Sequence, residues 1–246
     1  AEMLEWSGGL WRNFLRRYPE SNQMHKLMQR VSAKVDAMPT DRPDHEAART
    51  ELYRGQCNCP YWHGVFGGIY LLHLRHANHA ALLRAERLAD ASLRGDQAWQ
   101  EVTIADLDYD GTDEVLIDGR ELAAVLAPAK GGHLTALSAK REAHSLLATL
   151  SRRPEAYHER LASGEGALAT EARRVREYDW YLRQALVDHF LAPGTTLEQF
   201  RSSQYGELGD FVDRPYRVER AGGSPAEVVL VRDGHVWEGS VLGPLG

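Results

Sequence analysis

The sequence predicts an α+β protein with more than one domain, an N-terminal helical bundle followed by an antiparallel β-sandwich region. Two observations carry this prediction. Apolar residues recur at helical spacing up to Gly95, whereas the later segments are short and are separated by turn residues roughly every ten positions. We therefore place one domain at residues 1–95 and a second at residues 96–246. Because the chain stops soon after a predicted strand, whose edge would stay open, we expect the second domain to be truncated.

The first half is predicted to hold three or four helices. The clearest covers residues 21–38, where one stripe carries Met24, Leu27, Met28, Val31, Val35 and Met38. After a loop marked by two prolines, Asp44 is the expected N-cap of a shorter helix that stops at Gly55. A long helix is expected at residues 69–94, and its apolar face is assigned to Leu72, Ala80, Leu83, Leu88 and Ala91.

The second half is predicted to be built from short strands. Strands are expected at residues 99–105, 114–118, 121–128 and 133–140, with a hairpin signal at Asp118-Gly119. Residues 151–183 are compatible with a loop or a helix. Four more strands are expected, at residues 197–205, 215–220, 226–231 and 235–241, and the hairpin signal Asp233-Gly234 joins the last two.

Composition narrows the possible functions. The 246 residues are 43% hydrophobic with a formal charge of −6 and no basic block, so nucleic-acid binding has little support. No apolar run is long enough for a membrane helix, and the first residues lack the pattern of a signal peptide. The two cysteines are spaced C-x-C, which fits neither a disulfide framework nor a four-ligand zinc site. We interpret them as reduced thiols in a cytoplasmic protein.

The most unusual stretch is residues 56–70, which combines both cysteines, four aromatic side chains, three glycines and His63. Aromatic side chains with a polar tip can pack one end and present the other, so this stretch can form one wall of a binding site. A tight junction between two helices, with Trp62 filling the core, is the alternative and the commoner reason for such a cluster. Both interpretations remain open at this stage.

An acidic run at residues 106–114 is the sharpest local motif. Aspartates at its first, third and fifth positions and a glycine at the sixth match the front half of a calcium loop. The twelfth position holds Ile117 instead of glutamate, so the run is not an EF-hand. Asp113 or Glu114 could complete the shell instead, as in calcium loops that join two strands. The candidate ligands of this calcium site are Asp106, Asp108, Asp110, Asp113 and Glu114. A solvated acidic turn is the alternative.

Other catalytic motifs are absent from the sequence. There is no G-x-S-x-G nucleophile motif and no nucleotide-binding glycine fingerprint. His73, His76 and His79 share a predicted helix face, but no carboxylate or cysteine cluster accompanies them, so a polar helix face is the favoured interpretation.

Several longer strings resemble the 4-α-glucanotransferase and α-amylase branch of glycoside hydrolase family 57. They are similar to its middle region and to the start of its C-terminal β-domain. In this sequence they are residues 2–6, 11–26 and 56–71, followed by residues 106–114, 131–132, 152–158 and 188–190. The Trp-Arg-Asn-Phe-Leu and Tyr-Trp-His-Gly-Val-Phe-Gly-Gly strings are long enough to be specific.

This resemblance implies an architecture and a function. An N-terminal (β/α)7 barrel would carry a glutamate nucleophile and an aspartate acid/base, and helices and a β-sandwich would follow it. The reaction would be the retaining transfer of an α-1,4-glucan, without an organic cofactor. The resemblance places both catalytic residues upstream of this chain, so we expect a non-catalytic portion that closes over the glucan site. Its expected partners are a maltooligosaccharide and the catalytic barrel. The expected sugar-contacting residues are Trp6, Trp62 and His63.

Two other functions remain as alternatives. One is a free-standing carbohydrate-binding module, and the other is a calcium-stabilised structural module without a sugar role. A portion of an enzyme should expose an apolar face on its first helix where the barrel packs, whereas a free-standing module should not.

Overall fold

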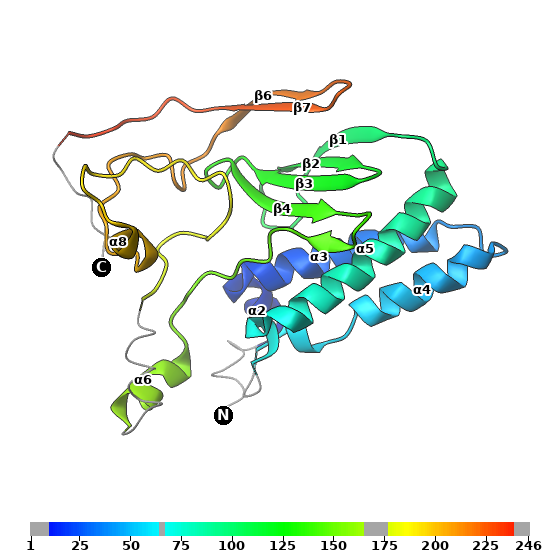
Figure 1. Cartoon of the computed structure of the whole chain (residues 1–246), viewed down its shortest axis with the longest axis horizontal. Coiled ribbons are helices and arrows are strands. Elements are labelled where there is room, and N and C mark those ends of the chain that lie inside the picture. Colours follow the sequence, from blue (N-terminus) through cyan, green and yellow to red (C-terminus); the bar gives the residue numbers. More distant parts are fainter. Residues whose placement is uncertain (1–9, 64–66, 165–176, 239–246) are drawn as a thin grey trace.

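The computed structural model describes residues 10–63, 67–164 and 177–238. Helices form one layer and an antiparallel sheet packs on it, with a two-stranded hairpin beyond the sheet (Figure 1). The predicted α+β class is confirmed. The division into two domains near residue 95 stays a prediction, although the last long helix ends at Arg94 and the first strand starts at Gln100.

The helical layer contains α2 (Trp11–Arg17), α3 (Pro19–Asp36), α4 (Pro43–Gly55) and α5 (Leu72–Arg94). The short turns η1 (Cys59–Tyr61) and η2 (Gly68–Tyr70) connect α4 to α5. Proline opens both α3 and α4, because its fixed φ suits the first helical turn and its missing N–H is not needed there. The predicted N-cap Asp44 is therefore wrong, since Arg42 takes that position and Asp44 lies in the first turn.

A shared apolar core holds α3, α4 and α5 together. The predicted apolar stripe is confirmed, because Met24, Val31 and Val35 of α3, and Met38 just after this helix, are all buried in this core. Gly55 lets α4 approach α5 closely, since an added Cβ there would lie 2.5 Å from Leu82 Cδ2. Close packing of this kind is sensitive to a single added methyl group.

The predicted apolar face of α5 is partly wrong. Leu72 and Ala91 are exposed, whereas the buried face carries polar side chains beside Ala81, Leu82, Ala85 and Ala89. These buried polar residues are Arg75, Asn78, Glu86 and Asp90. Each has hydrogen-bond or ion-pair partners that a pattern of apolar residues does not reveal.

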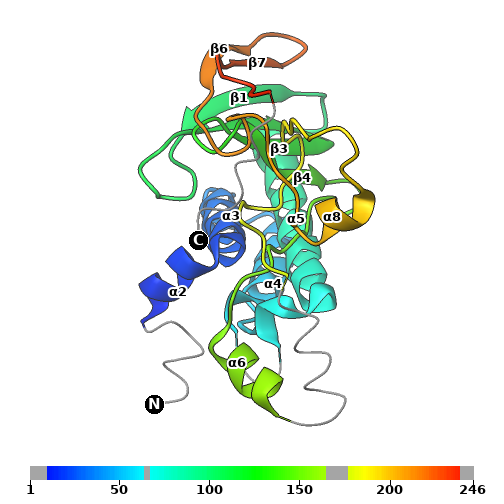
Figure 2. The same cartoon turned by 90° about the vertical axis from the view of Figure 1, so that its left-hand side faces the viewer.

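The main sheet is a simple antiparallel meander in the order β1-β2-β3-β4-β5. Figure 2 shows its strands β1, β3 and β4 beside the helical layer. Its strands are β1 (Gln100–Ala105), β2 (Glu114–Gly119), β3 (Leu122–Ala127), β4 (His133–Ala139) and β5 (His144–Ser145). The four predicted strands are confirmed within one or two residues at each end. A second, two-stranded sheet consists of β6 (Arg217–Gly222) and β7 (Glu227–Val231), and β6 contacts β1.

Two predictions for the second half are wrong. Residues 197–205 do not form a strand, because Thr196 and Gln199 form a capping box that starts helix α8 (Leu197–Arg201). Asp233-Gly234 is not a hairpin turn, since the hairpin joins β6 to β7 and Val236 instead forms an isolated bridge with Gly209. Gly234 lies against Phe211, where an added Cβ would be 2.6 Å from the ring. The segment 151–183, which the sequence left open, contains helix α6 (Ala156–Ser163).

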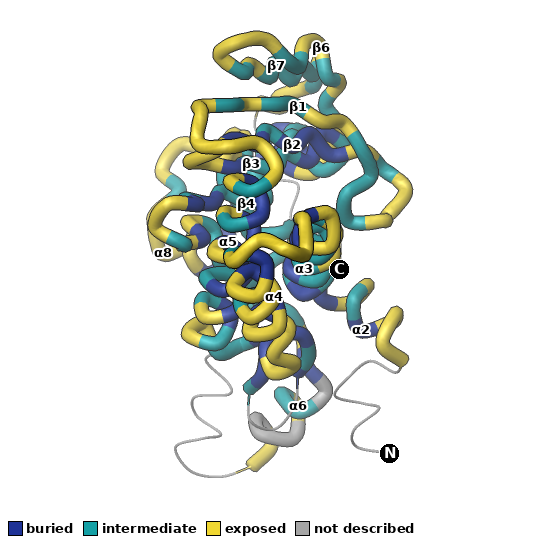
Figure 3. Tube along the Cα trace, turned by 90° about the vertical axis from the view of Figure 1, so that its right-hand side faces the viewer, coloured by how far each residue is buried: buried dark blue, intermediate teal, exposed yellow. Residues whose placement is uncertain are grey.

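A buried ionic cluster joins the helices to the sheet. We use the name helix–sheet ionic cluster for Arg30, Lys34, Glu86, Asp90, Asp118 and Lys140. The Lys34 ammonium lies 2.8 Å from carboxylate oxygens of Glu86 and of Asp90, and 3.0 Å from Asp118. The tube coloured by burial shows how buried segments of the helices meet those of the sheet (Figure 3).

Among the described residues, no helix combines the length and the apolar character that crossing a membrane requires.

Candidate carbohydrate-binding and cation-binding sites

The structure describes two of the three predicted sugar-contacting residues, Trp62 and His63, and they lie in different environments. Trp62 and His63 follow η1, and Trp6 lies outside the described residues. Trp62 is partly buried and packs against the small core of Phe14, Tyr18 and Ile69. His63 is almost completely buried, and its Nδ1 lies 3.3 Å from the carbonyl oxygen of Gly67. Burial lowers the pKa of His63, so the ring is neutral at pH 7.

Trp62 lines an aromatic groove on the helical layer. The groove has a volume of about 500 Å³ and is formed by Trp11, His25, Met28, Gln56, Asn58, Tyr61 and Trp62. Trp11 stacks on Phe14 with ring centroids 6.0 Å apart, and its own ring remains half exposed. The side chain of Leu10, directly before Trp11, is 77% exposed. Leu10 and Trp11 therefore expose apolar and aromatic side chains at the groove and directly beside it in the chain.

His63 belongs to a second group, around the carboxylate of Glu155. We use the name glutamate–tyrosine cluster for Arg17, Tyr18, His63, Tyr70 and Glu155. The Tyr18 hydroxyl donates to Glu155 at 2.7 Å, and the Tyr70 hydroxyl donates to the same carboxylate. The Arg17 guanidinium lies 3.0 Å from Glu155 Oε2. The His63 ring meets Tyr70 edge-on with centroids 4.7 Å apart. Burial and the neighbouring Glu155 raise the pKa of both tyrosines, so both hydroxyls remain donors.

Glu155 also lines a cleft with a volume of about 1210 Å³. The cleft lies between the start of the helical layer and the irregular segment 177–183, and Lys130 and His133 line it from the sheet side. Aromatic and imidazole side chains line it at His158, Tyr178, Trp180 and Tyr181. His158 Nδ1 lies 3.0 Å from the Tyr178 hydroxyl oxygen, and the two rings are stacked.

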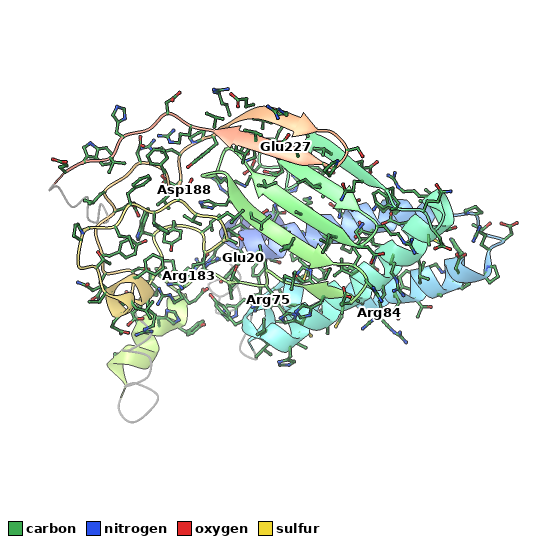
Figure 4. The ribbon with its side chains drawn as sticks, turned by 45° about the horizontal axis from the view of Figure 1, so that its top comes forward. Glu20, Arg75, Arg84, Arg183, Asp188 and Glu227 are labelled. Carbon is green, nitrogen blue, oxygen red and sulfur yellow. The ribbon has the colours of Figure 1, made fainter. Side chains whose placement is uncertain are left out.

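One carboxylate holds the wall of this cleft in place. The side chain of Asp179 is fully buried and accepts hydrogen bonds from Arg152 Nη2 at 2.6 Å and from Arg183 Nε at 2.8 Å. Arg153, which also lines the cleft, pairs with Glu20 at the start of α3. Figure 4 labels Glu20 and Arg183, the partners of the cleft-lining Arg153 and Asp179. Because every link is charge-assisted, the wall is rigid.

The acidic loop between β1 and β2 brings three of the five predicted calcium ligands together. Asp106, Asp108 and Glu114 each offer one carboxylate oxygen, and these atoms lie within 4.8 Å of one another. Asp110 instead hydrogen-bonds Thr112 and lies 2.5 Å from the Lys130 ammonium. Asp113 is exposed and outside this group of three.

The local hydrogen bonds shape this loop. Both oxygens of Asp106 accept backbone N–H groups, those of Asp110 and Gly111, at 3.1 and 3.0 Å. Glu114 Oε2 accepts the N–H of Leu107 at 2.9 Å. Among the described residues, the buried atoms Asp108 Oδ1 and Glu114 Oε1 have no hydrogen-bond partner. Burial, and then the neighbouring Asp108, raise the pKa of Glu114 to about 7. Orphaned carboxylate oxygens at this spacing fit a hard cation such as Ca²⁺.

Sequence reasoning missed the residues that form the large cleft. Glu155 and His158 belong to a string that was used only for its family resemblance, and Trp180 was not singled out. Glu155 meets Tyr18 across a separation of 137 residues, so local periodicity contains no signal for the pair. The density of aromatic residues in Tyr178-Asp179-Trp180-Tyr181 was the one local signal available.

Comparison with known families identifies the class of protein. The family model for the middle domain of alpha-amylase/4-alpha-glucanotransferase matches residues 9–89, and the model for the C-terminal domain of the same family matches residues 106–242. These matches cover most of the chain, and the chain therefore belongs to this family. The resemblance to the glycoside hydrolase family 57 branch is confirmed.

Individual relatives agree with this assignment. The chain is 41% identical to the 4-alpha-glucanotransferase of Thermococcus kodakarensis, over 93% of this chain and 34% of the relative. It is 40% identical to the alpha-amylase of Pyrococcus furiosus, over 86% of this chain and 32% of the relative. The crystal structure of the Thermococcus litoralis 4-alpha-glucanotransferase matches with a TM-score of 0.78 at 39% identity, over 95% of this chain and 34% of that structure. The chain thus spans about a third of the length of these relatives.

Proposed function

We propose that this chain is a non-catalytic portion of an α-1,4-glucan-acting enzyme that packs against a catalytic barrel and shapes its glucan site. The observation that carries the proposal is the apolar surface formed by Leu10 and the aromatic groove around Trp11 and Trp62. Exposed apolar patches of this kind mark interaction surfaces. In this proposal Trp62 contacts the glucan from the groove, and the buried His63 holds the loop behind it.

The proposal is tested by association with the missing partner. The portion of the Thermococcus kodakarensis relative outside the matched third would be produced separately and mixed with this chain, with sedimentation velocity as the readout. A complex is expected, and it should be weakened at least tenfold by Leu10→Glu, because the substitution buries a charge in the interface. Leu197→Glu is the matched control, since Leu197 is 82% exposed on α8 and Leu10 is 77% exposed. Absence of a complex would overturn the proposal.

The alternative of a free-standing carbohydrate-binding module predicts a different result. Such a module would form no complex with the partner, and Leu10→Glu would therefore change nothing in the sedimentation experiment. The exposed Leu10 and Trp11 favour the enzyme-portion proposal over this alternative. We also place the protein in the cytoplasm, a location supported by the free, exposed thiols of Cys57 and Cys59.

The acidic loop supports a second proposal, a structural calcium ion held by Asp106, Asp108 and Glu114. The orphaned oxygens of Asp108 and Glu114 are the supporting observation. The loop already contacts α3, where Asn22 Nδ2 donates to the carbonyl oxygen of Asp108 at 2.6 Å and Lys26 lies over the Tyr109 ring. A bound cation would stabilise this contact between the loop and the helix, without taking part in chemistry.

Calorimetric titration with CaCl₂ and thermal unfolding test this calcium site. Calcium in large excess should raise the midpoint of unfolding by at least ~3 °C, and EDTA should reverse the effect. Glu114→Gln should abolish the response, whereas Asp113→Asn should leave it intact, because Asp113 lies outside the group of three. An unchanged midpoint in calcium would reject the site.

A further inference from the structure

We propose that the 1210 Å³ cleft between the start of the helical layer and residues 177–183 is a binding site for a short α-glucan chain, with Trp180 as its stacking platform. The choice of an α-glucan rests on the proposed function, whereas the location, size and chemistry of the site come from the cleft itself.

The size of the cleft indicates an extended ligand. Pockets for single small molecules usually measure ~300–1,000 Å³. At about 1210 Å³ this cleft exceeds that range, so it has room for several linked sugar units and is oversized for one ion or one monosaccharide.

The charge balance indicates a neutral ligand. Five arginine and lysine side chains line the cleft, and four of them are paired with a carboxylate within 3.0 Å, whereas the fifth, Arg16, is exposed. The pairs are Arg17–Glu155, Arg152–Asp179, Arg153–Glu20 and Lys130–Asp108. A phosphate or other anion held by any of these four cations would have to break the pair and leave a carboxylate without its partner, which is costly. That leaves Arg16 of the five, whose charge water screens because the side chain is exposed. A neutral polyhydroxylated chain can add hydrogen bonds to such pairs without breaking them.

The aromatic side chains of the cleft present flat, partly solvent-exposed surfaces. Trp180 is 37% exposed at the cleft and meets Tyr181 edge-on, with ring centroids 4.9 Å apart. Tyr178 stacks on His158 on the same side of the cleft. Rings that bury one face and present the other suit the apolar face of a sugar ring, while its hydroxyl groups reach the polar rim.

The platform is held in place before any ligand arrives. Trp180 lies between Tyr181 and the buried Asp179, whose carboxylate is fixed by Arg152 and Arg183. The Tyr205 ring also lies near the Trp180 ring, tilted to it, with a centroid distance of 6.3 Å. A rigid wall lowers the entropy cost of binding, which favours measurable affinity for a neutral ligand.

Isothermal titration calorimetry of the whole chain with maltoheptaose tests the inference. Trp180→Leu should weaken binding about tenfold, equivalent to the loss of ~1.4 kcal/mol of stacking. Trp180→Phe keeps a flat ring and should stay within about threefold of the unmodified chain. Trp237→Leu is the matched control, because Trp237 is 36% exposed and does not line the cleft.

A second measurement is independent of how well Trp180→Leu folds. In ¹H–¹⁵N spectra of the unmodified chain, the indole signal of Trp180, assigned through Trp180→Phe, should shift during the titration. Cellohexaose should produce neither heat nor a shift.

Three outcomes would overturn the inference: no binding of maltoheptaose, equal binding of cellohexaose, or binding that Trp62→Leu weakens and Trp180→Leu does not. The last result would place the sugar in the aromatic groove and would leave the proposed function standing. Failure of the partner association described above, with the Trp180 effect intact, would overturn the proposed function alone.

Discussion

Two buried clusters of carboxylates connect distant parts of this chain, and they are built differently. The helix–sheet ionic cluster opposes three cations, Arg30, Lys34 and Lys140, to the three carboxylates of Glu86, Asp90 and Asp118. The glutamate–tyrosine cluster has one carboxylate, Glu155, which accepts hydrogen bonds from two phenols and one half-exposed guanidinium.

The difference indicates separate roles. Every charge of the helix–sheet ionic cluster is matched by side chains, and none of its members lines the large cleft, so its geometry is fixed by the fold alone. Glu155 lines that cleft, and two of its three hydrogen-bond donors there are neutral phenols instead of cations. We infer that the first cluster fixes the helical layer against the sheet, whereas the second shapes a surface that meets ligands.

The largest expected effect comes from breaking the ionic cluster at Lys140. Its side chain is fully buried between Asp90 and Asp118, so Lys140→Met leaves the three buried carboxylates of the cluster with only two cations. Removing one partner of a buried ion pair costs about 3–5 kcal/mol. Urea unfolding should show this loss, and Arg141→Met is the control, because Arg141 is exposed and its nearest carboxylate, that of Glu142, lies 4.0 Å away. Equal stability of the two variants would mean that the cluster does not hold the layers together.

Breaking the glutamate–tyrosine cluster should lower the unfolding free energy by less than breaking the helix–sheet ionic cluster. Glu155→Gln keeps the shape of the side chain and one acceptor but removes the charge that Arg17 and the tyrosine hydroxyls meet. We expect a loss of about 2 kcal/mol in unfolding free energy, since hydrogen bonds to charged groups contribute more than neutral ones. Glu159→Gln removes a charge from the first turn of α6 and is the control. A loss as large as that of Lys140→Met would remove the distinction between the clusters.

The sequence predicted the elements whose signals are local. The stripe of Met24, Val31 and Val35 has the helical period, and the strands from residue 99 to residue 140 are separated by Gly and Asp turns. Helix α8 was missed although its capping box, Thr196 to Gln199, is also a local signal, because the apolar residues between 197 and 205 were interpreted as a strand.

The candidate sites were predicted only where ligands are neighbours in the chain. Asp106, Asp108 and Glu114 lie within nine residues of one another, so their spacing was enough to bring them together in the prediction. Both buried clusters join side chains from elements far apart in sequence, such as Lys34 and Asp118. Such pairs are set by tertiary packing, which no local pattern encodes.

A smaller effect on folding stability is expected from pH. Two buried glutamates, Glu86 and Glu114, should change the stability with pH in opposite directions. Burial alone would raise the pKa of Glu86, but Arg30, Lys34 and Lys140 outweigh it, and the pKa falls below its ordinary value of 4.5. Glu86 therefore stabilises the fold above that value, and its contribution is lost as pH falls through the lowered pKa. The pKa of Glu114 is instead raised from 4.5 to about 7, by burial and by Asp108. Between these values the folded chain binds more protons than the unfolded chain, so stability falls as pH rises.

Urea unfolding without calcium between pH 4.5 and 7.5 measures the contribution of Glu114 to stability. This contribution is the difference in unfolding free energy between the unmodified chain and Glu114→Gln. The unmodified chain should lose on the order of 1 kcal/mol relative to the variant across this range. Parallel curves would show that Glu114 titrates normally and would weaken the case for a cation site.

The smallest effect on stability is expected for an exposed ion pair whose distance is similar to that of the buried Lys140–Asp90 pair. Arg220 and Glu227 pair across the β6–β7 hairpin at 2.9 Å, with side chains 64% and 56% exposed. Water screens such pairs, so Arg220→Gln should change the unfolding free energy by less than ~0.5 kcal/mol. The pair distance nearly equals the 3.0 Å between Lys140 and Asp90. A loss close to that of Lys140→Met would show that distance and not burial governs both pairs. The expected contrast instead follows from the cost of leaving a carboxylate uncompensated where water cannot reach it.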